Sequence, residues 1–158
     1  MSGLDMKELA STSNLDNRDT FLSVCVDLVD PRHSLHLQRR MKSIKRSVGD
    51  RRIEAALDDS LETLLRAFAD LGDGVRSAVG FIDLESDFLR VGGLGTRIPT
   101  SVVLDASPYI LPLAQFQDSY ETFVLVFIDG QHCRIHLVHD ALGEEVAEHS
   151  HSALGAHR

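Results

Sequence analysis

The chain has 158 residues, of which 43% are hydrophobic and 25% are charged, a balance that predicts a globular protein with one domain, or with one domain and part of a second. Its net charge of -8 argues against wholesale wrapping of nucleic acid, but it permits a local basic patch because surface fields depend on how charges are distributed. The two cysteines, Cys25 and Cys133, lie in apolar runs, which predicts buried side chains in a reducing compartment rather than a disulfide framework.

The first predicted segment is a polar leader over 1–20 that lacks the apolar core of a signal peptide. No apolar run reaches the ~18 residues that a membrane-spanning helix needs, so we expect a cytoplasmic protein without membrane contact. Alternating apolar and small residues over 21–29 then predict a strand, which Asp30-Pro31 ends.

Two helices are predicted next, from apolar residues that recur every three or four positions. In the first helix these residues are Leu37, Met41, Ile44 and Val48. The second helix repeats the spacing over 51–71. Gly72 and Gly74 end it, because glycine adopts the left-handed cap conformation without a steric penalty.

Short strands are predicted over 75–83, 87–93 and 101–105, with a short helix within 107–118. A hairpin follows, in which the runs FVLVFI and HCRIHLV flank Asp129-Gly130, a pair suited to the positive φ angles of a tight turn. Together these elements predict an α+β chain, with a mixed sheet and helices in its first domain.

Seven basic side chains lie within fourteen residues of the two predicted helices, mostly off the apolar face of the first. They are Arg39, Arg40, Lys42, Lys45, Arg46, Arg51 and Arg52. Because the rest of the chain is strongly acidic, this segregation of charge indicates contacts with the phosphates of RNA. The alternative interpretation is an ordinary solvated helix face.

Two other polar clusters are candidate chemical sites. The hairpin carries three histidines, His132, His136 and His139. Two imidazoles on one strand face could ligate zinc, but Arg134 between them would repel a cation, and no Cys-x-x-Cys or His-Glu-x-x-His pattern accompanies them. We therefore expect a polar strand face and no metal. Asp27 and Asp30 could pair as acid and base, yet we expect ordinary polar residues at a strand end.

Three stretches carry a family resemblance: FLSVCVDLVDP, VRSAVGFID, and VVLDASPYILPLAQFQDSYETFVLVFIDGQHCRIHLVHD. Over about 20–140 the chain resembles the archaeo-eukaryotic class I release factor and Pelota superfamily, in particular its bacterial branch of Balon-like hibernation and release-factor-like proteins. The resemblance implies a release-factor-like N-terminal α/β domain over 21–119. It also implies that 120–158 is the opening β-hairpin of an incomplete second α/β domain, truncated before a Gly-Gly loop.

The function implied by this resemblance is that of a ribosome-associated translation factor, active in rescue, hibernation or release, whose basic helix binds rRNA near the A site. The ribosome is the implied partner and a translation GTPase is a second candidate, with no DNA and no cofactor. Met41-Lys42-Ser43-Ile44 shares only its Lys-Ser pair with the codon-reading Asn-Ile-Lys-Ser motif of eukaryotic members. Codon recognition is therefore not carried over.

Catalysis is not carried over either, because the sequence has no Gly-Gly-Gln motif. Any hydrolysis of peptidyl-tRNA would need the missing Gly-Gly loop, so we expect no catalytic activity in this part of the protein. Two alternatives remain open at this point. One is a metal-dependent hydrolase that uses His132, His136 and His139, and the other is a non-enzymatic protein-interaction module.

Overall fold

The computed structural model describes residues 4–16, 18–48, 51–119, 123–128 and 133–138. The chain divides into two compact units, Met1–Ala114 and Gln115–Arg158. Helices and strands both contribute to the fold, which confirms the predicted α+β class. Within the described ranges, no helix is both long and apolar enough to cross a membrane.

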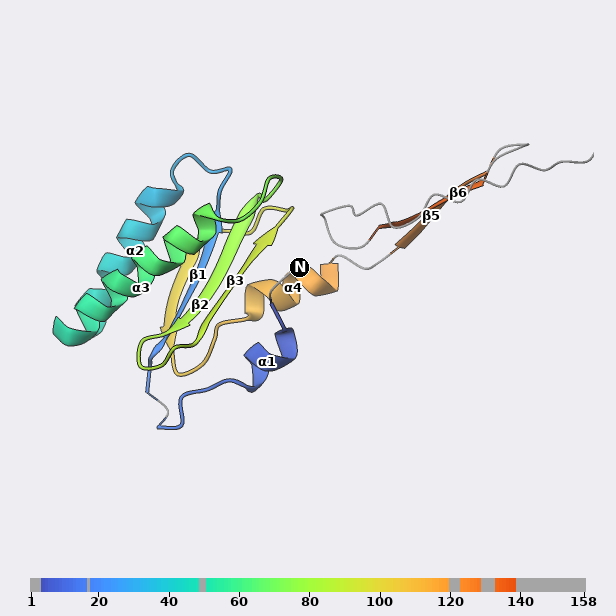
Figure 1. The fold of residues 1–158 in the computed structure, drawn as a ribbon. Coiled ribbons are helices and arrows are strands. Elements are labelled where there is room, and N and C mark those ends of the chain that lie inside the picture. The colour runs from blue at the N-terminus through green and yellow to red at the C-terminus, as the bar shows by residue number, and fades with distance from the viewer. Residues whose placement is uncertain (1–3, 17, 49–50, 120–122, 129–132, 139–158) are drawn as a thin grey trace, which may run out of the picture. The chain divides into compact units, whose positions relative to one another are not determined.

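The elements follow one another in the order that the sequence predicts (Figure 1). They are α1 (Met6–Ser11), β1 (Phe21–Asp27), α2 (His33–Val48), α3 (Arg51–Ala69), β2 (Ser77–Asp83), β3 (Leu89–Leu94), β4 (Ser101–Asp105), α4 (Leu111–Ser119), β5 (Phe123–Ile128) and β6 (Cys133–Val138). The leader contains α1, which begins after Asp5 because the Asp5 carboxylate accepts hydrogen bonds from the backbone N–H groups of Lys7 and Glu8, at 2.8 and 3.3 Å.

The four strands of the first unit form one sheet in the order β3-β2-β1-β4, and every neighbouring pair is antiparallel. The prediction of a mixed sheet was therefore wrong. A single crossover helix would have made β2 parallel to β1. Here two helices run down and back, so the chain returns to the end of the sheet where β1 finished, and β2 runs in the opposite direction (Figure 1).

The central strand, β1, is buried along its whole length. On one face Leu22, Val24 and Val26 join the hydrophobic core beneath α2 and α3. The other face carries Cys25, which is free and buried, and burial raises the pKa of its thiol to about 11. The predicted buried environment of Cys25 is therefore confirmed, and its thiol is a packing group rather than a nucleophile.

The helix pair α2 and α3 covers one face of the sheet (Figure 1). From α2, Leu37 and Met41 are buried in the core, as their spacing predicts. From α3 the corresponding residues are Leu57, Leu64 and Phe68. Helix α3 lies so close to β2 that a Cβ atom at Gly80 would stand 2.5 Å from Leu64 Cδ2 and 2.9 Å from Phe68 Cε1. Glycine at position 80 is therefore required by this approach.

The opposite face of the sheet is covered in part by α1 and the residue before its cap (Figure 1). Leu9 is 1% exposed, and Leu4 packs against Gly92, where an added Cβ atom would lie 2.5 Å from Leu4 Cδ1. Glu8 and Arg90 form a two-pronged ion pair, with Arg90 Nε 3.0 Å from Glu8 Oε2. This pair joins α1 to β3 and holds the pKa of Glu8 below its usual value.

The second unit contains the predicted hairpin strands. β5 and β6 pair antiparallel, from Phe123 opposite Val138 to Ile128 opposite Cys133. The predicted Asp129-Gly130 turn lies outside the described residues, as does the segment 139–158.

The approach of α3 to β2 leads to a prediction about Gly80. Replacing Gly80 by Ala should destabilise the protein by about 1–3 kcal/mol, because the new methyl group forces Leu64 and Phe68 out of their packed positions. Gly72→Ala is the matched control, since nothing lies within 4 Å of a Cβ atom there. Urea unfolding followed by circular dichroism should show a lower midpoint for G80A only. Equal midpoints for the two variants would mean that the helix–sheet approach does not constrain this position.

Candidate nucleic-acid interface

The predicted basic residues lie on α2 and on the first turn of α3. Because Leu37 and Met41 turn one side of α2 toward the sheet, the charged side chains project from its other side. Six of the seven are exposed: Arg39, Arg40, Lys42, Arg46, Arg51 and Arg52. We call these six side chains the basic face.

Lys45 is the exception among the predicted residues. Its side chain is only 26% exposed and forms an ion pair with Asp58 of α3. Lys45 therefore bridges the two helices and already has a partner inside the molecule. Because the Asp58 carboxylate partly cancels its charge, Lys45 would attract an anionic ligand less strongly than Arg46 on the same helix.

Several arginines outside the basic face have their charges compensated by carboxylates. Arg18 pairs with Asp16 and Glu85, Arg66 with Glu62, Arg90 with Glu8, and Arg97 with Asp27. By contrast, among the described residues no carboxylate oxygen lies within 4.0 Å of a charged nitrogen of Arg39, Arg40, Lys42, Arg46 or Arg51. Their positive charge is therefore not neutralised by an ion pair with the described part of the chain.

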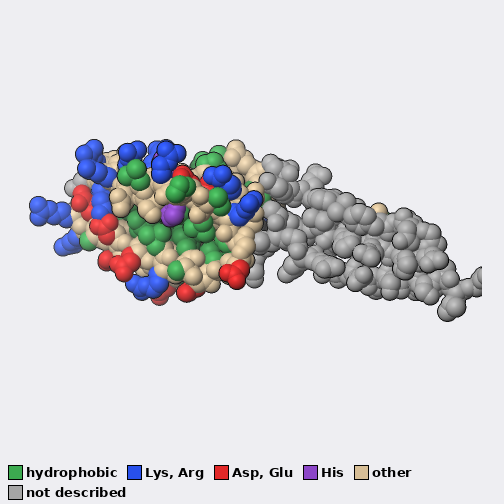
Figure 2. All heavy atoms as spheres, turned by 90° about the horizontal axis from the view of Figure 1, so that it is seen from above, with side chains coloured by type: hydrophobic (Ala, Val, Ile, Leu, Met, Phe, Trp, Pro, Cys, Tyr) green, Lys and Arg blue, Asp and Glu red, His purple; other side chains and the backbone are tan. Residues whose placement is uncertain are grey.

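Charge is also segregated at the level of the surface. Figure 2 shows one face of the molecule, with a row of Lys and Arg side chains along its upper margin and further ones at the left and lower margins, while the acidic side chains lie mostly to the left and toward the lower margin. The chain as a whole carries a net charge of -8. The positive patch therefore results from where the basic side chains lie on the surface and not from the overall charge of the chain.

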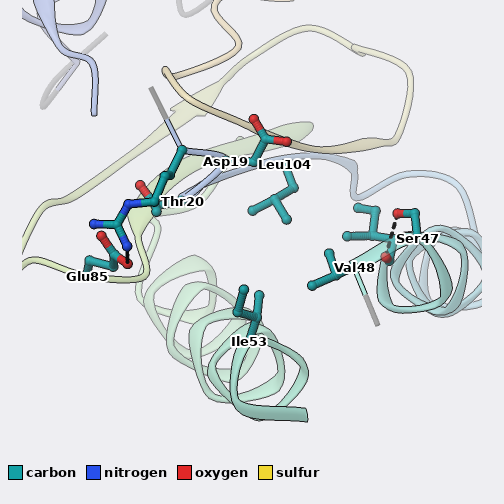
Figure 3. Close-up of a pocket in the computed structure, with 9 residues that line it drawn as sticks. Asp19, Thr20, Ser47, Val48, Ile53, Glu85 and Leu104 are labelled. Carbon is teal, nitrogen blue, oxygen red and sulfur yellow. Dashed lines mark hydrogen bonds and ion pairs between the residues drawn. The ribbon is translucent and has the colours of Figure 1, made fainter. Parts of the chain in front are cut away.

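A pocket of about 580 Å³ lies beside the last turn of α2 and the first turn of α3. Its apolar wall comes from Ile44 and Val48 of α2, Ile53 of α3 and Leu104 of β4, and three of these side chains are labelled around the space in Figure 3. A neighbouring pocket of about 180 Å³ shares Asp19, Thr20, Ile53 and Glu85 with it. The two form one hollow at the end of the sheet where β1 begins.

The margin of this hollow is polar. Arg18 Nη1 lies 2.7 Å from Glu85 Oε1, which brings the segment before β1 against the turn after β2. The buried Thr20 hydroxyl accepts a hydrogen bond from Asn14 Nδ2 at 3.0 Å. The sequence offered no signal for this hollow, because Arg18 and Glu85 are 67 positions apart and neither belongs to a recognisable motif.

Asp27 and Asp30 do not form an acid–base pair. The Asp27 carboxylate accepts hydrogen bonds from Arg97 Nη2 at 2.7 Å, from Arg97 Nε at 2.9 Å and from the Val29 N–H at 3.1 Å. The Arg97 guanidinium holds the pKa of Asp27 below its usual value. Asp30 accepts from the Arg32 N–H and lies 3.5 Å from His36 Nε2. Each carboxylate thus organises its own part of the loop into α2, in agreement with the expectation of strand-end polar residues.

The histidines of the hairpin are not placed by the structure. His132 and His139 lie outside the described residues, and of His136 only its position in β6 is described. Among the described side chains, no group of three or more His, Cys, Asp or Glu residues is arranged to hold a metal ion.

The Asp27–Arg97 pair predicts a pH dependence of stability. A carboxyl group whose pKa is lower in the folded than in the unfolded state stabilises the fold above its unfolded value, and this contribution is lost as the pH falls through the folded pKa. Asp27→Asn should therefore be less stable than the parent at neutral pH, with a difference that shrinks below about pH 4. Urea midpoints between about pH 3 and 7 measure it. Arg97→Gln should reproduce the effect, and a difference that is constant over this range would exclude it.

The helix pair thus presents five cations without a described carboxylate partner on one side of a rigid support, next to a hollow with an apolar wall. Such an arrangement can bind phosphate groups, and nothing in it supplies an activated nucleophile. Comparison of the sequence with models of protein families found no match, and a comparison with curated proteins found none either.

Proposed function

We propose that this chain is part of a cytoplasmic, ribosome-associated translation factor of the release-factor type, and that the basic face binds rRNA near the A site. The role would be rescue, hibernation or release. The observation that carries the RNA contact is the set of exposed cations on α2 and α3 that have no described carboxylate partner. The ribosome as the source of that RNA is proposed from the resemblance of 20–140 to the release-factor and Pelota superfamily.

The physical argument for RNA is the release of counterions. Each phosphate that an Arg or Lys neutralises frees a condensed cation, so affinity falls with rising salt in proportion to the number of contacts. Arg39, Arg40 and Arg46 suit this role because they are exposed and their guanidinium groups carry no ion pair to a described residue. Because the chain has a net charge of -8, its acidic regions would repel RNA, whereas the basic face would attract it.

The first test is co-sedimentation of the full chain with ribosomes at low salt. Reversing three charges of the basic face, with Arg39→Glu, Arg40→Glu and Arg46→Glu together, should weaken binding by at least about tenfold. The matched control is Lys7→Glu, Arg66→Glu and Arg76→Glu, which changes the net charge equally at exposed cations outside the basic face. The control should bind like the parent. Equal losses in the two triple variants, or no binding by the parent chain, would refute the proposal.

A second test separates Lys45 from its neighbours. Arg46→Gln should lower the slope of log K against log salt by roughly 0.7–0.9, the value for one phosphate contact. Lys45→Gln should leave the slope unchanged, because Lys45 is paired with Asp58 and is not counted among the phosphate contacts. Fluorescence anisotropy with a labelled rRNA fragment at several salt concentrations measures both slopes. A reduced slope for K45Q would show that Lys45 leaves Asp58 and contacts RNA.

A further inference from the structure

We infer that the basic face binds double-helical RNA through its backbone and does not bind unpaired RNA by stacking on its bases. This inference rests on the proposed RNA-binding function and specifies the class of RNA. It follows from three features of the described residues: the absence of exposed aromatic side chains, the convex helical support of the cations, and the charge at the margin of the neighbouring hollow.

Aromatic side chains are the first feature. Proteins that bind single strands stack successive bases on Phe, Tyr or Trp, and this stacking supplies much of their affinity. Among the residues whose side-chain exposure the structure describes, no Phe or Tyr is exposed, and the chain has no Trp. Phe21, Phe68, Phe81 and Phe116 are buried, while Phe88 and Tyr109 are half-buried. The Phe88 ring already contacts other side chains: its centroid lies 5.6 Å from that of Phe21 and 4.9 Å from Arg90 Cζ.

The helices themselves offer no stacking platform. Across α2 and α3 the single Phe, Tyr or Trp residue is Phe68, which is 7% exposed and packs beneath the helix pair. His33 and His36 are half-buried and both contact Asp30. The basic face therefore has charge and hydrogen-bond donors but no aromatic surface on which unpaired bases could stack.

The shape of the support is the second feature. Arg39, Lys42 and Arg46 recur every three or four residues, so they lie in one row that extends for roughly 10 Å along the helix. Arg51 continues the positive charge on the next helix. Because the surface of a helix is convex, this row of cations can contact a line of phosphates on the outside of a double helix, but it cannot enclose a single strand. The exposed side chains of Gln38, which precedes Arg39, and Ser43, which follows Lys42, can hydrogen-bond to 2′-hydroxyl or phosphate oxygens.

The neighbouring hollow is the third feature. Channels for single strands are lined with positive charge that follows the backbone. Here the lining carries both signs of charge: the carboxylates of Asp19 and Glu85, and the guanidinium groups of Arg18 and Arg52, of which Arg18 is shared between Glu85 and Asp16. This mixed lining lacks the continuous positive charge of a channel for a single strand. The cations therefore favour contact across a double helix, whose recognition depends on shape, phosphates and 2′-hydroxyl groups.

The experiment compares one 20-base-pair RNA duplex with an unstructured single strand of the same length, by fluorescence anisotropy with the full chain at fixed salt. We expect the duplex to bind at least about fivefold more tightly, and a second duplex of unrelated sequence to bind within about twofold of the first. The basic-face triple variant should lose binding to both duplexes. The control variant K7E/R66E/R76E should retain it.

Two other outcomes have different meanings. A single strand that binds as tightly as the duplex, or more tightly, overturns the inference while leaving the proposed RNA-binding function in place. Absence of binding to either RNA, together with absence of co-sedimentation with ribosomes, overturns the proposed function and the inference with it. A strong preference between the two duplex sequences would also overturn the inference, because it would require contacts with base edges.

Discussion

The burial of the apolar sides of α2 and α3 on the sheet is the constraint on which the remaining features depend. Leu37 and Met41 from one helix and Leu57, Leu64 and Phe68 from the other must all leave water, and Gly80 lets α3 approach closely enough for this. When the apolar sides are buried, the geometry of the helix places the charged residues of the basic face on the side that faces the solvent. The basic face is thus a consequence of core packing, and its rigidity comes from the same contacts.

Within this framework, two groups of Lys and Arg side chains can be distinguished by their ion pairs. Those that join separate segments of the chain, such as Arg18 to Glu85 and Arg90 to Glu8, are positioned by the fold and contribute to its assembly. Arg39, Arg40, Lys42, Arg46 and Arg51 of the basic face have no described carboxylate partner, so their charge is available to a ligand. Lys45 belongs to the first group although it lies in the sequence among the second, because its position on α2 brings it to Asp58 of α3.

Local patterns in the sequence predicted the elements well, since a period of three to four residues, a period of two, and the glycines and prolines that end each run act over short distances. The prediction of a mixed sheet was wrong. The directions of the strands depend on which strands pair and on how the chain returns to the sheet, which no local period encodes. The exposed cations were also predicted from spacing. The pairing of Lys45 with Asp58 and the hollow lined by Thr20, Ile53 and Leu104 were not, because both arise between segments that meet only in the folded chain.

The segregation of charge has a consequence for how the molecule meets a polyanion. The basic face gathers several cations of a chain with a net charge of -8 on one helix pair. Such an uneven distribution of charge favours encounters with a polyanion in which the basic face points toward it. Selection of the binding orientation therefore begins at a distance of about one Debye length, before any side chain makes a contact.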